Sequence, residues 1–148
     1  MSVTLRERAL RLLARREHAR AELARKLAAH AESEEDIREL LDDLSERGLL
    51  SDERYVEARL NTRAARFGNA RLAHELRTQG VAEELVSSAL AASGEELQRA
   101  RSVWQHRFGD APAPRDAAER ARQARFLMNR GFSGETTRRV LRGDLEDE

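Results

Sequence analysis

Two six-residue stretches, LRTQGV at residues 76–81 and LMNRGF at residues 127–132, share one arrangement of apolar residues and glycine. In each stretch a leucine is followed four positions later by glycine and then by an apolar residue, Val81 or Phe132. A glycine directly after a helix adopts positive φ without a steric penalty, and the apolar residue behind it packs back on the helix. Each stretch therefore predicts a helix that stops at its glycine, with a new helix soon after.

The two stretches belong to an internal repeat that occurs three times. The leading leucines are spaced by 49 and 51 residues, and a second leucine follows each of them fourteen positions later. The three pairs are Leu27 with Leu41, Leu76 with Leu90, and Leu127 with Leu141. The first copy is looser, because Ala31 stands where the other copies have Gly80 and Gly131. A repeat of this length predicts a small structural unit that packs on its neighbours.

Helices are expected almost throughout the chain. Ala, Leu, Arg and Glu dominate, the 148 residues include only eight Gly and two Pro, and no stretch has the alternation of a strand. A further helix with an apolar stripe is expected before each pair of helices, at about residues 5–16, 52–66 and 95–108. Ser33 and Ser133 are placed to cap the last helix of the first and third copies.

The expected fold is all-α. It consists of three tandem three-helix repeat modules at residues 1–50, 51–94 and 95–148, the last with an acidic C-terminal tail. Modules of this size complete their cores by stacking, which predicts an elongated and curved body. Structural turns are expected at four glycines: Gly48, Gly68, Gly80 and Gly131.

Composition and motifs exclude several functional classes. The absence of cysteine removes disulfide frameworks, zinc ribbons and thiol catalysis. No apolar run approaches the roughly 18 residues of a membrane span and no signal peptide opens the chain, so a cytoplasmic protein is expected. There is no glycine-rich phosphate loop or nucleophile elbow, and the four histidines are expected at the surface. Neither catalysis nor a metal or cofactor is predicted.

Basic and acidic side chains number 27 each, but they are segregated along the chain. Residues 1–31, 58–82 and 99–143 carry net charges of +5, +4 and +7, and the remaining segments are acidic. Arginines recur at helical spacing in the basic segments, which predicts basic helix faces for a charged partner. Guanidinium groups bind phosphates and carboxylates alike, so spacing leaves the partner open. The candidate partner-binding residues are Arg11, Arg15, Arg59, Arg63, Arg71, Arg125 and Arg130.

Several stretches resemble the RecX regulatory family. ALRLLARREHARAEL at residues 9–23 is similar to the family's opening, and GLLSDERYVE at residues 48–57 is similar to its Gly-Leu-Leu/Ile-Asp-Asp-x-x-Phe/Tyr-Ala run. The chain departs from the family pattern at Ala19, where serine is usual, and at Ser51, where aspartate is common. Further matches follow in order along the chain: Arg63, Gly68, Arg71, Glu75-Leu76, Gly80-Val81 and RFLMNRGF at residues 125–132.

The resemblance implies a non-enzymatic regulator that binds RecA or RecA–DNA filaments and inhibits recombinase, ATPase and co-protease activity. It also implies contact with DNA itself. Apart from the resemblance, we expect no membrane partner and a chain that acts as a monomer. From the residues alone two other functions stay open. One is a general helical DNA-binding protein, and the other is a helical scaffold for a different cytosolic partner.

Overall fold

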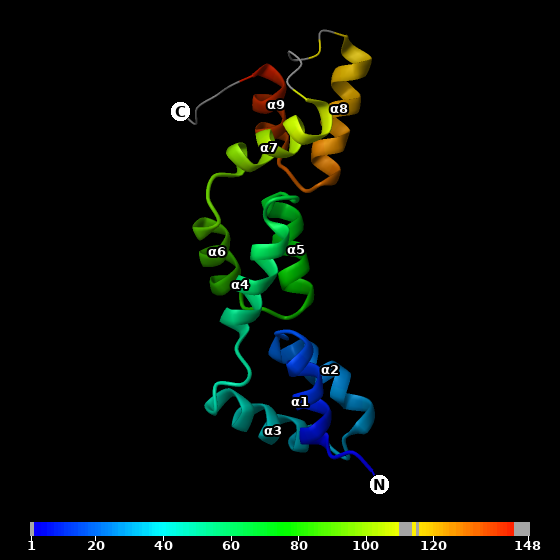
Figure 1. Ribbon diagram of the computed structural model, residues 1–148, viewed down its shortest axis with the longest axis vertical. Coiled ribbons are helices and arrows are strands. Elements are labelled where there is room, and N and C mark those ends of the chain that lie inside the picture. The colour runs from blue at the N-terminus through cyan, green and yellow to red at the C-terminus, as the bar shows by residue number, and fades with distance from the viewer. Residues whose placement is uncertain (1, 110–113, 115, 144–148) are drawn as a thin grey trace. The chain divides into compact units, whose positions relative to one another are not determined.

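The computed structural model describes residues 2–109, 114 and 116–143, and within these ranges every regular element is helical (Figure 1). The acidic tail predicted at residues 144–148 lies outside the described residues. The all-α prediction is confirmed. The elements in chain order are α1 (Leu5–Arg15), α2 (Arg20–Leu27), the 3₁₀ helix η1 (Ala28–His30), α3 (Glu34–Glu46), α4 (Asp52–Arg63), α5 (Asn69–Thr78), α6 (Glu83–Ala92), α7 (Glu96–Phe108), α8 (Ala117–Asn129) and α9 (Gly134–Arg142).

Serine side chains cap α3 and α9 as predicted. The hydroxyl of Ser33 accepts a hydrogen bond of 3.1 Å from the backbone N–H of Asp36. Ser133 accepts a bond of the same length from Thr136. Each cap satisfies one of the backbone donors that the first turn of a helix leaves unpaired, a contribution of about 1 kcal/mol.

The two stretches that open the repeat pattern form the same helix stop. Gly80 and Gly131 have φ values of 81° and 92°. The residue behind each glycine, Val81 or Phe132, donates its backbone N–H to the carbonyl of the leucine five positions earlier, at 3.1 and 3.3 Å. Both apolar side chains are buried. In the first copy Ala31 has an ordinary extended φ of −99°, and a 3₁₀ turn leads up to it instead of a left-handed residue.

The chain divides into two compact units. One unit comprises Met1–Arg59 with Leu76–Val86, and the other comprises Leu60–Glu75 with Ser87–Glu148. The helices of the middle repeat are therefore shared between the units. The core of the first unit is aliphatic and comes from α1, α2, α3 and the segment that follows α3. Its buried residues are Ala9, Leu23, Leu27, Ile37, Leu40, Leu41, Leu44 and Leu50.

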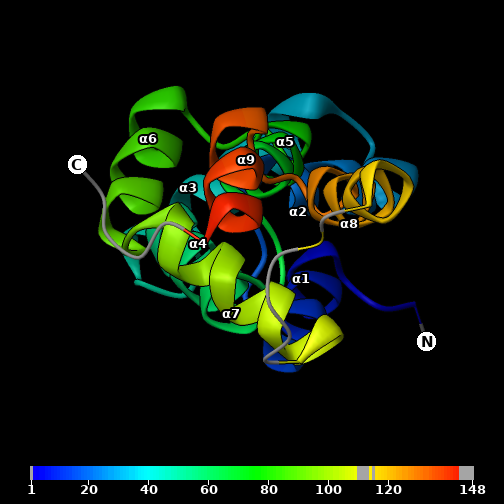
Figure 2. The same cartoon turned by 90° about the horizontal axis from the view of Figure 1, so that it is seen from above.

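The core of the second unit comes from α7, α8 and α9. Helix α9 packs on both α7 and α8, and it lies beside α7 in both views (Figures 1 and 2). The buried Trp104 donates its indole N–H to Gln123, at 2.8 Å, so that neither polar group is left unpaired inside the core. The buried apolar residues are Leu97, Ala100, Val103, Trp104, Leu127, Phe132, Val140 and Leu141.

Within the first unit, α2 begins against the turn between α5 and α6. A Cβ on Gly80 would stand 2.6 Å from the Cβ of Ala21, so this approach requires glycine. The carboxylate of Asp52, at the start of α4, accepts a 2.7 Å hydrogen bond from the backbone N–H of Arg20. Asp52 thus completes the N-terminus of α2 from the following repeat.

The second unit contains the same type of joint, formed by the start of α5 and the turn between α8 and α9. The backbone N–H of Gly68 donates to the carbonyl of Arg130 at 2.8 Å, and that of Ala70 donates to Gly131 at 3.2 Å. A Cβ on Gly68 would overlap the carbonyl of Gly131. Gly68 lies at a turn, as predicted. Because it has no side chain, it also allows this turn to approach the turn at Gly131 closely.

Candidate functional site

Three of the seven candidate arginines meet around one aromatic ring, that of Phe67. The guanidinium carbons of Arg71, Arg63 and Arg130 lie 4.0, 4.5 and 5.5 Å from the ring centroid. Arg66 completes the group at 5.9 Å. These four arginines around Phe67 are called the Phe67 cluster below. Each such contact is worth about 0.5–1 kcal/mol at an exposed position and more when it is desolvated.

Local structure explains why these side chains converge. Helix α4 ends at Arg63, and a tight turn brings Phe67 back, its N–H donating to the carbonyl of Arg63 at 3.1 Å. Helix α5 begins two residues after Phe67 and places Arg71 in its first turn. Arg130 is the C-cap residue directly after α8, and the joint at Gly68 holds it against this turn.

Arg99 of α7 holds the turn at Phe67 in place through hydrogen bonds. Arg99 donates to the carbonyls of Ala64 and Phe67 at 2.9 and 2.7 Å, and to the side chain of Asn69 at 2.7 Å. Burial lowers the pKa of Arg99, and the nearby charge of Glu96 opposes that effect. Arg99 is thus a positioning residue that fixes the backbone under the Phe67 cluster.

One carboxylate, that of Glu75, lies within the Phe67 cluster. It accepts two hydrogen bonds from the guanidinium of Arg63, at 2.7 and 2.5 Å. It also lies 3.6 Å from Arg71, one helical turn earlier on α5. The cluster keeps a positive excess, because Glu75 offsets only one of its four guanidinium charges.

Sequence reasoning did not bring these residues together. Arg63, Arg71 and Arg130 were predicted as members of separate basic helix faces, and neither Arg66 nor Glu75 was among the candidates. In the sequence Arg66 follows Arg63 at helical spacing within the predicted helix at residues 52–66, a signal that could have added Arg66, although α4 ends at Arg63. The convergence with Arg130 depends on the joint between two turns, for which the sequence contains no local signal.

Arg11 and Arg15 lie in a different place, on α1. They line a hollow of about 350 Å³ with an apolar floor that includes Leu12 and Leu27. The other side chains of this basic hollow are Arg8, Lys26 and His30. The structure therefore brings together two of the predicted arginines here, and adds three basic groups to them.

The remaining two candidate arginines, Arg59 and Arg125, belong neither to the Phe67 cluster nor to the basic hollow. Arg59 is half-buried on α4, one turn before Arg63. Arg125 is exposed on α8. In the part of the chain that the structure describes, neither guanidinium lies over the Phe67 ring.

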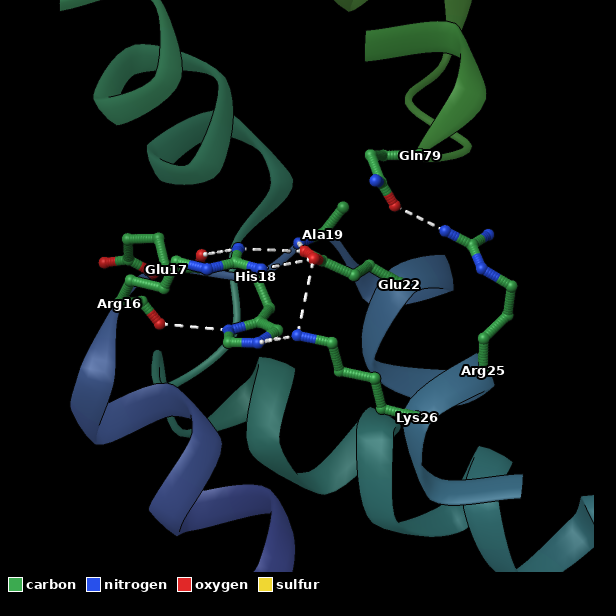
Figure 3. A network of polar contacts seen from close by, with 8 residues as sticks. All are labelled: Arg16, Glu17, His18, Ala19, Glu22, Arg25, Lys26 and Gln79. Carbon is green, nitrogen blue, oxygen red and sulfur yellow. Dashed lines mark hydrogen bonds and ion pairs between the residues drawn. The ribbon is translucent and has the colours of Figure 1, made fainter. Parts of the chain in front are cut away.

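A largely buried polar network joins α2 to the segment that precedes it, residues 16–19 (Figure 3). Glu22 is 6% exposed and accepts two hydrogen bonds from Arg16, at 3.1 and 2.5 Å. Its carboxylate also lies 3.6 Å from Lys26 and accepts from the backbone N–H of Ala19, at 3.3 Å. Burial acts to raise the pKa of Glu22, but the hydrogen bond and charge of Arg16 outweigh it and the pKa lies below its ordinary value.

The prediction that all four histidines lie at the surface is wrong for His18, which is only 1% exposed. Its Nδ1 lies 3.1 Å from the carbonyl of Arg16 and its Nε2 lies 2.9 Å from Nζ of Lys26. A neutral ring satisfies both contacts, with Nδ1–H donating and Nε2 accepting. Burial lowers the pKa of His18, and the charges of Arg16 and Lys26 lower it further. This histidine is a structural residue of the first unit.

No group of three or more potential metal ligands occurs among the described residues. Over the same residues, none of the helices has the length and apolar character needed to cross a bilayer.

Fold and site together define a protein of tandem three-helix repeats with arginine-rich surfaces. Comparison with known families matches the first, second and third RecX three-helix domains to residues 6–44, 51–90 and 94–141. The chain belongs to the RecX family of regulatory proteins.

Individual relatives agree with this assignment over nearly the whole chain. The regulatory protein RecX of Leptothrix cholodnii is 52% identical over 141 residues, which is 95% of this chain and 88% of that protein. RecX of Herminiimonas arsenicoxydans is 44% identical, with 100% and 97% covered. The crystal structure of RecX from Lactobacillus salivarius superposes with a TM-score of 0.77 over 94% of this chain and 93% of that one. Its 18% identity supports the shared fold alone.

Proposed function

We propose that this chain is a regulator of the RecA recombinase that binds RecA or the RecA–DNA filament and lowers its ATPase, recombinase and co-protease activities. Membership of the RecX family supports this function, because the family resemblance implies a binding protein directed at RecA. Because RecA filaments form on chromosomal DNA, a protein that binds them acts in the cytoplasm. The chain acts as a monomer of three modules, at residues 1–50, 51–94 and 95–148.

The observation that best supports a binding surface is the Phe67 cluster. Arg63, Arg71 and Arg130 match positions of the family pattern, and they come from two turns far apart in the sequence that meet at one ring. Arginine is the side chain best suited to hold carboxylates and phosphates through paired N–H groups. We assign the filament contact to this cluster, with the basic hollow at Arg11 and Arg15 and the helix faces at Arg59 and Arg125 as further contact surfaces.

The function is tested by RecA ATPase on single-stranded DNA with increasing amounts of this chain. Inhibition of hydrolysis supports the proposal, and unchanged hydrolysis at several-fold excess contradicts it. Inhibition far below one copy per RecA subunit would indicate binding at filament ends. A requirement for near-equimolar amounts would indicate binding along the groove.

The excess positive charge of the Phe67 cluster also favours a second function, general DNA binding. The two functions differ in their dependence on RecA. A filament regulator associates with DNA much more strongly once RecA and a nucleotide are present, whereas a general DNA-binding protein binds bare DNA tightly with a steep salt dependence. A scaffold for another partner would leave RecA hydrolysis unchanged and would be recovered with that partner in a pull-down.

A further inference from the structure

The carboxylate of Glu75 occupies the Phe67 cluster in the way that a bound anion would. It receives two parallel hydrogen bonds from the Arg63 guanidinium, which is the geometry with which arginine holds a carboxylate or a phosphate. A second guanidinium, that of Arg71, approaches the same carboxylate at 3.6 Å. An incoming anion at this place would meet two donors that are already oriented.

The charge of the cluster calls for a partner with closely spaced negative groups. Four guanidiniums lie within 5.9 Å of one ring centroid, and Glu75 offsets one of them. The neighbouring Arg99 and Glu96 offset each other, so they leave this excess unchanged. Nucleic acid carries one negative charge about every 3.4 Å along each strand, and its phosphates therefore supply closely spaced negative groups.

The cluster exposes guanidinium groups and covers the aromatic ring. Phe67 is 9% exposed beneath the arginines, so bases do not have a free ring face on which to stack. Arg66 and Arg71 are exposed, and the side chain of Glu75 is 23% exposed, so an anion can reach the carboxylate and replace it. Contacts of this kind position a backbone and carry no sequence information.

We propose that Arg63, Arg66, Arg71 and Arg130 bind phosphodiester groups of nucleic acid, and that Glu75 is an internal competitor which a phosphate must displace. This inference deepens the proposed function, since it assigns a partner chemistry to one surface of the filament contact. It has an unusual consequence: neutralising Glu75 strengthens binding.

The chain offers a matched control for that substitution. Glu83 forms the same paired hydrogen bonds with one arginine, Arg77, at 2.7 and 2.6 Å. Glu83→Gln and Glu75→Gln make the same change in net charge, but only Glu75 lies among several guanidiniums. Any difference between these two variants therefore reports on the Phe67 cluster and not on overall charge.

The experiment measures the affinity of the full chain for a fluorescently labelled 30-nucleotide oligo-dT, in the absence of RecA, as a function of salt. Each phosphate contact on a single strand contributes about −0.7 to the slope of log K against log salt. Glu75→Gln should make the slope steeper by about 0.7 and tighten binding roughly 5–10-fold at 50 mM salt, and Arg71→Gln should do the reverse. Thermal unfolding of each variant shows that the fold is kept.

Two results would overturn the inference. One is a Glu75→Gln variant, folded, with the affinity and slope of the original chain. The other is a Glu83→Gln variant that gains as much as Glu75→Gln. Failure of the RecA ATPase assay with the original chain would contradict the proposed function, and it would leave this comparison on bare DNA intact.

Discussion

The carboxylate of Glu96, in the first turn of α7, accepts a 3.2 Å hydrogen bond from the backbone N–H of Asn69, the first residue of α5. The other carboxylate oxygen of Glu96 accepts a 2.9 Å bond from the backbone of Ser133, just before α9. Asp52 of α4 makes the equivalent contact with Arg20 at the start of α2. One acidic residue at the start of a repeat thus completes a helix N-terminus of the preceding repeat, at both joints.

Removal of the Glu96 carboxylate should therefore loosen the joint in the second unit. Glu96→Ala leaves two backbone donors without their partner, and we expect the free energy of unfolding to fall by about 1–3 kcal/mol. Urea unfolding followed by circular dichroism measures the change. The adjacent Glu95, which is exposed, provides the control, since Glu95→Ala should change stability by less than about 0.5 kcal/mol. Equal effects of the two substitutions would contradict this role of Glu96.

Close packing at the same joint predicts a difference between two glycine substitutions. Gly48 and Gly131 both have positive φ, at 74° and 92°, so alanine is strained at either position. A Cβ at Gly48 meets nothing within 4 Å, whereas at Gly131 it would overlap the backbone and Cβ of Arg71. We expect Gly48→Ala to cost about 1 kcal/mol and Gly131→Ala to cost about 1–3 kcal/mol more. Thermal unfolding of both variants measures the loss of stability. Equal losses at Gly48 and Gly131 would contradict the prediction that the close contact between Gly131 and Arg71 requires glycine.

The buried His18 predicts a pH dependence of stability. Because its pKa is lower in the folded chain than the ordinary value of 6.5, the unfolded chain binds more protons as the pH falls through this value. The free energy of unfolding should therefore decrease as the pH falls below about 6.5. Arg16 and Lys26 face the ring with positive charge, and Glu22 is the acidic group that opposes them.

The test is urea unfolding at pH 7.5 and pH 5.5. His18→Asn removes the titrating group, so the variant should lose less stability between these two pH values than the original chain loses. His30→Asn, at an exposed histidine, should keep the original dependence. If His18→Asn and the original chain lose stability equally, His18 does not cause the pH dependence.

Local patterns predicted the fold well, and they did so for physical reasons. The Leu–Gly–apolar stretches predicted the helix stops at Gly80 and Gly131, because few residues other than glycine adopt positive φ at a helix end. The serine caps at Ser33 and Ser133 were predicted because a cap depends only on the few residues around it.

The contacts that depend on distant residues were not predicted. His18 was expected at the surface, but it is buried because Arg16 and Lys26 supply partners for both ring nitrogens. The arginines of the Phe67 cluster were assigned to separate helix faces, because the meeting of Gly68 with Gly131 brings together positions more than sixty residues apart. Helical spacing describes one helix at a time and contains no information on such a joint.

The structure determines which substitutions are suitable for testing the proposed filament contact. Replacing Arg63 by glutamate would place a second carboxylate next to Glu75 and remove a half-buried ion pair, which destabilises the fold itself. Arg66 and Arg71 are exposed, and glutamine at both positions removes two charges while the Arg63–Glu75 pair remains. Arg47 is an exposed arginine paired with Asp43 on α3, and Arg47→Gln is a control for the loss of surface charge.

The most direct test of the proposed filament contact is the inhibition of RecA ATPase on single-stranded DNA by the Arg66→Gln/Arg71→Gln variant. If the Phe67 cluster contacts the filament, half-maximal inhibition should require at least about fivefold more of the variant than of the original chain, since arginines in the centre of an interface commonly contribute more than about 1 kcal/mol each. Arg47→Gln should inhibit like the original chain. A folded double variant that inhibits as strongly as the original chain would contradict the proposal that the Phe67 cluster contacts the filament.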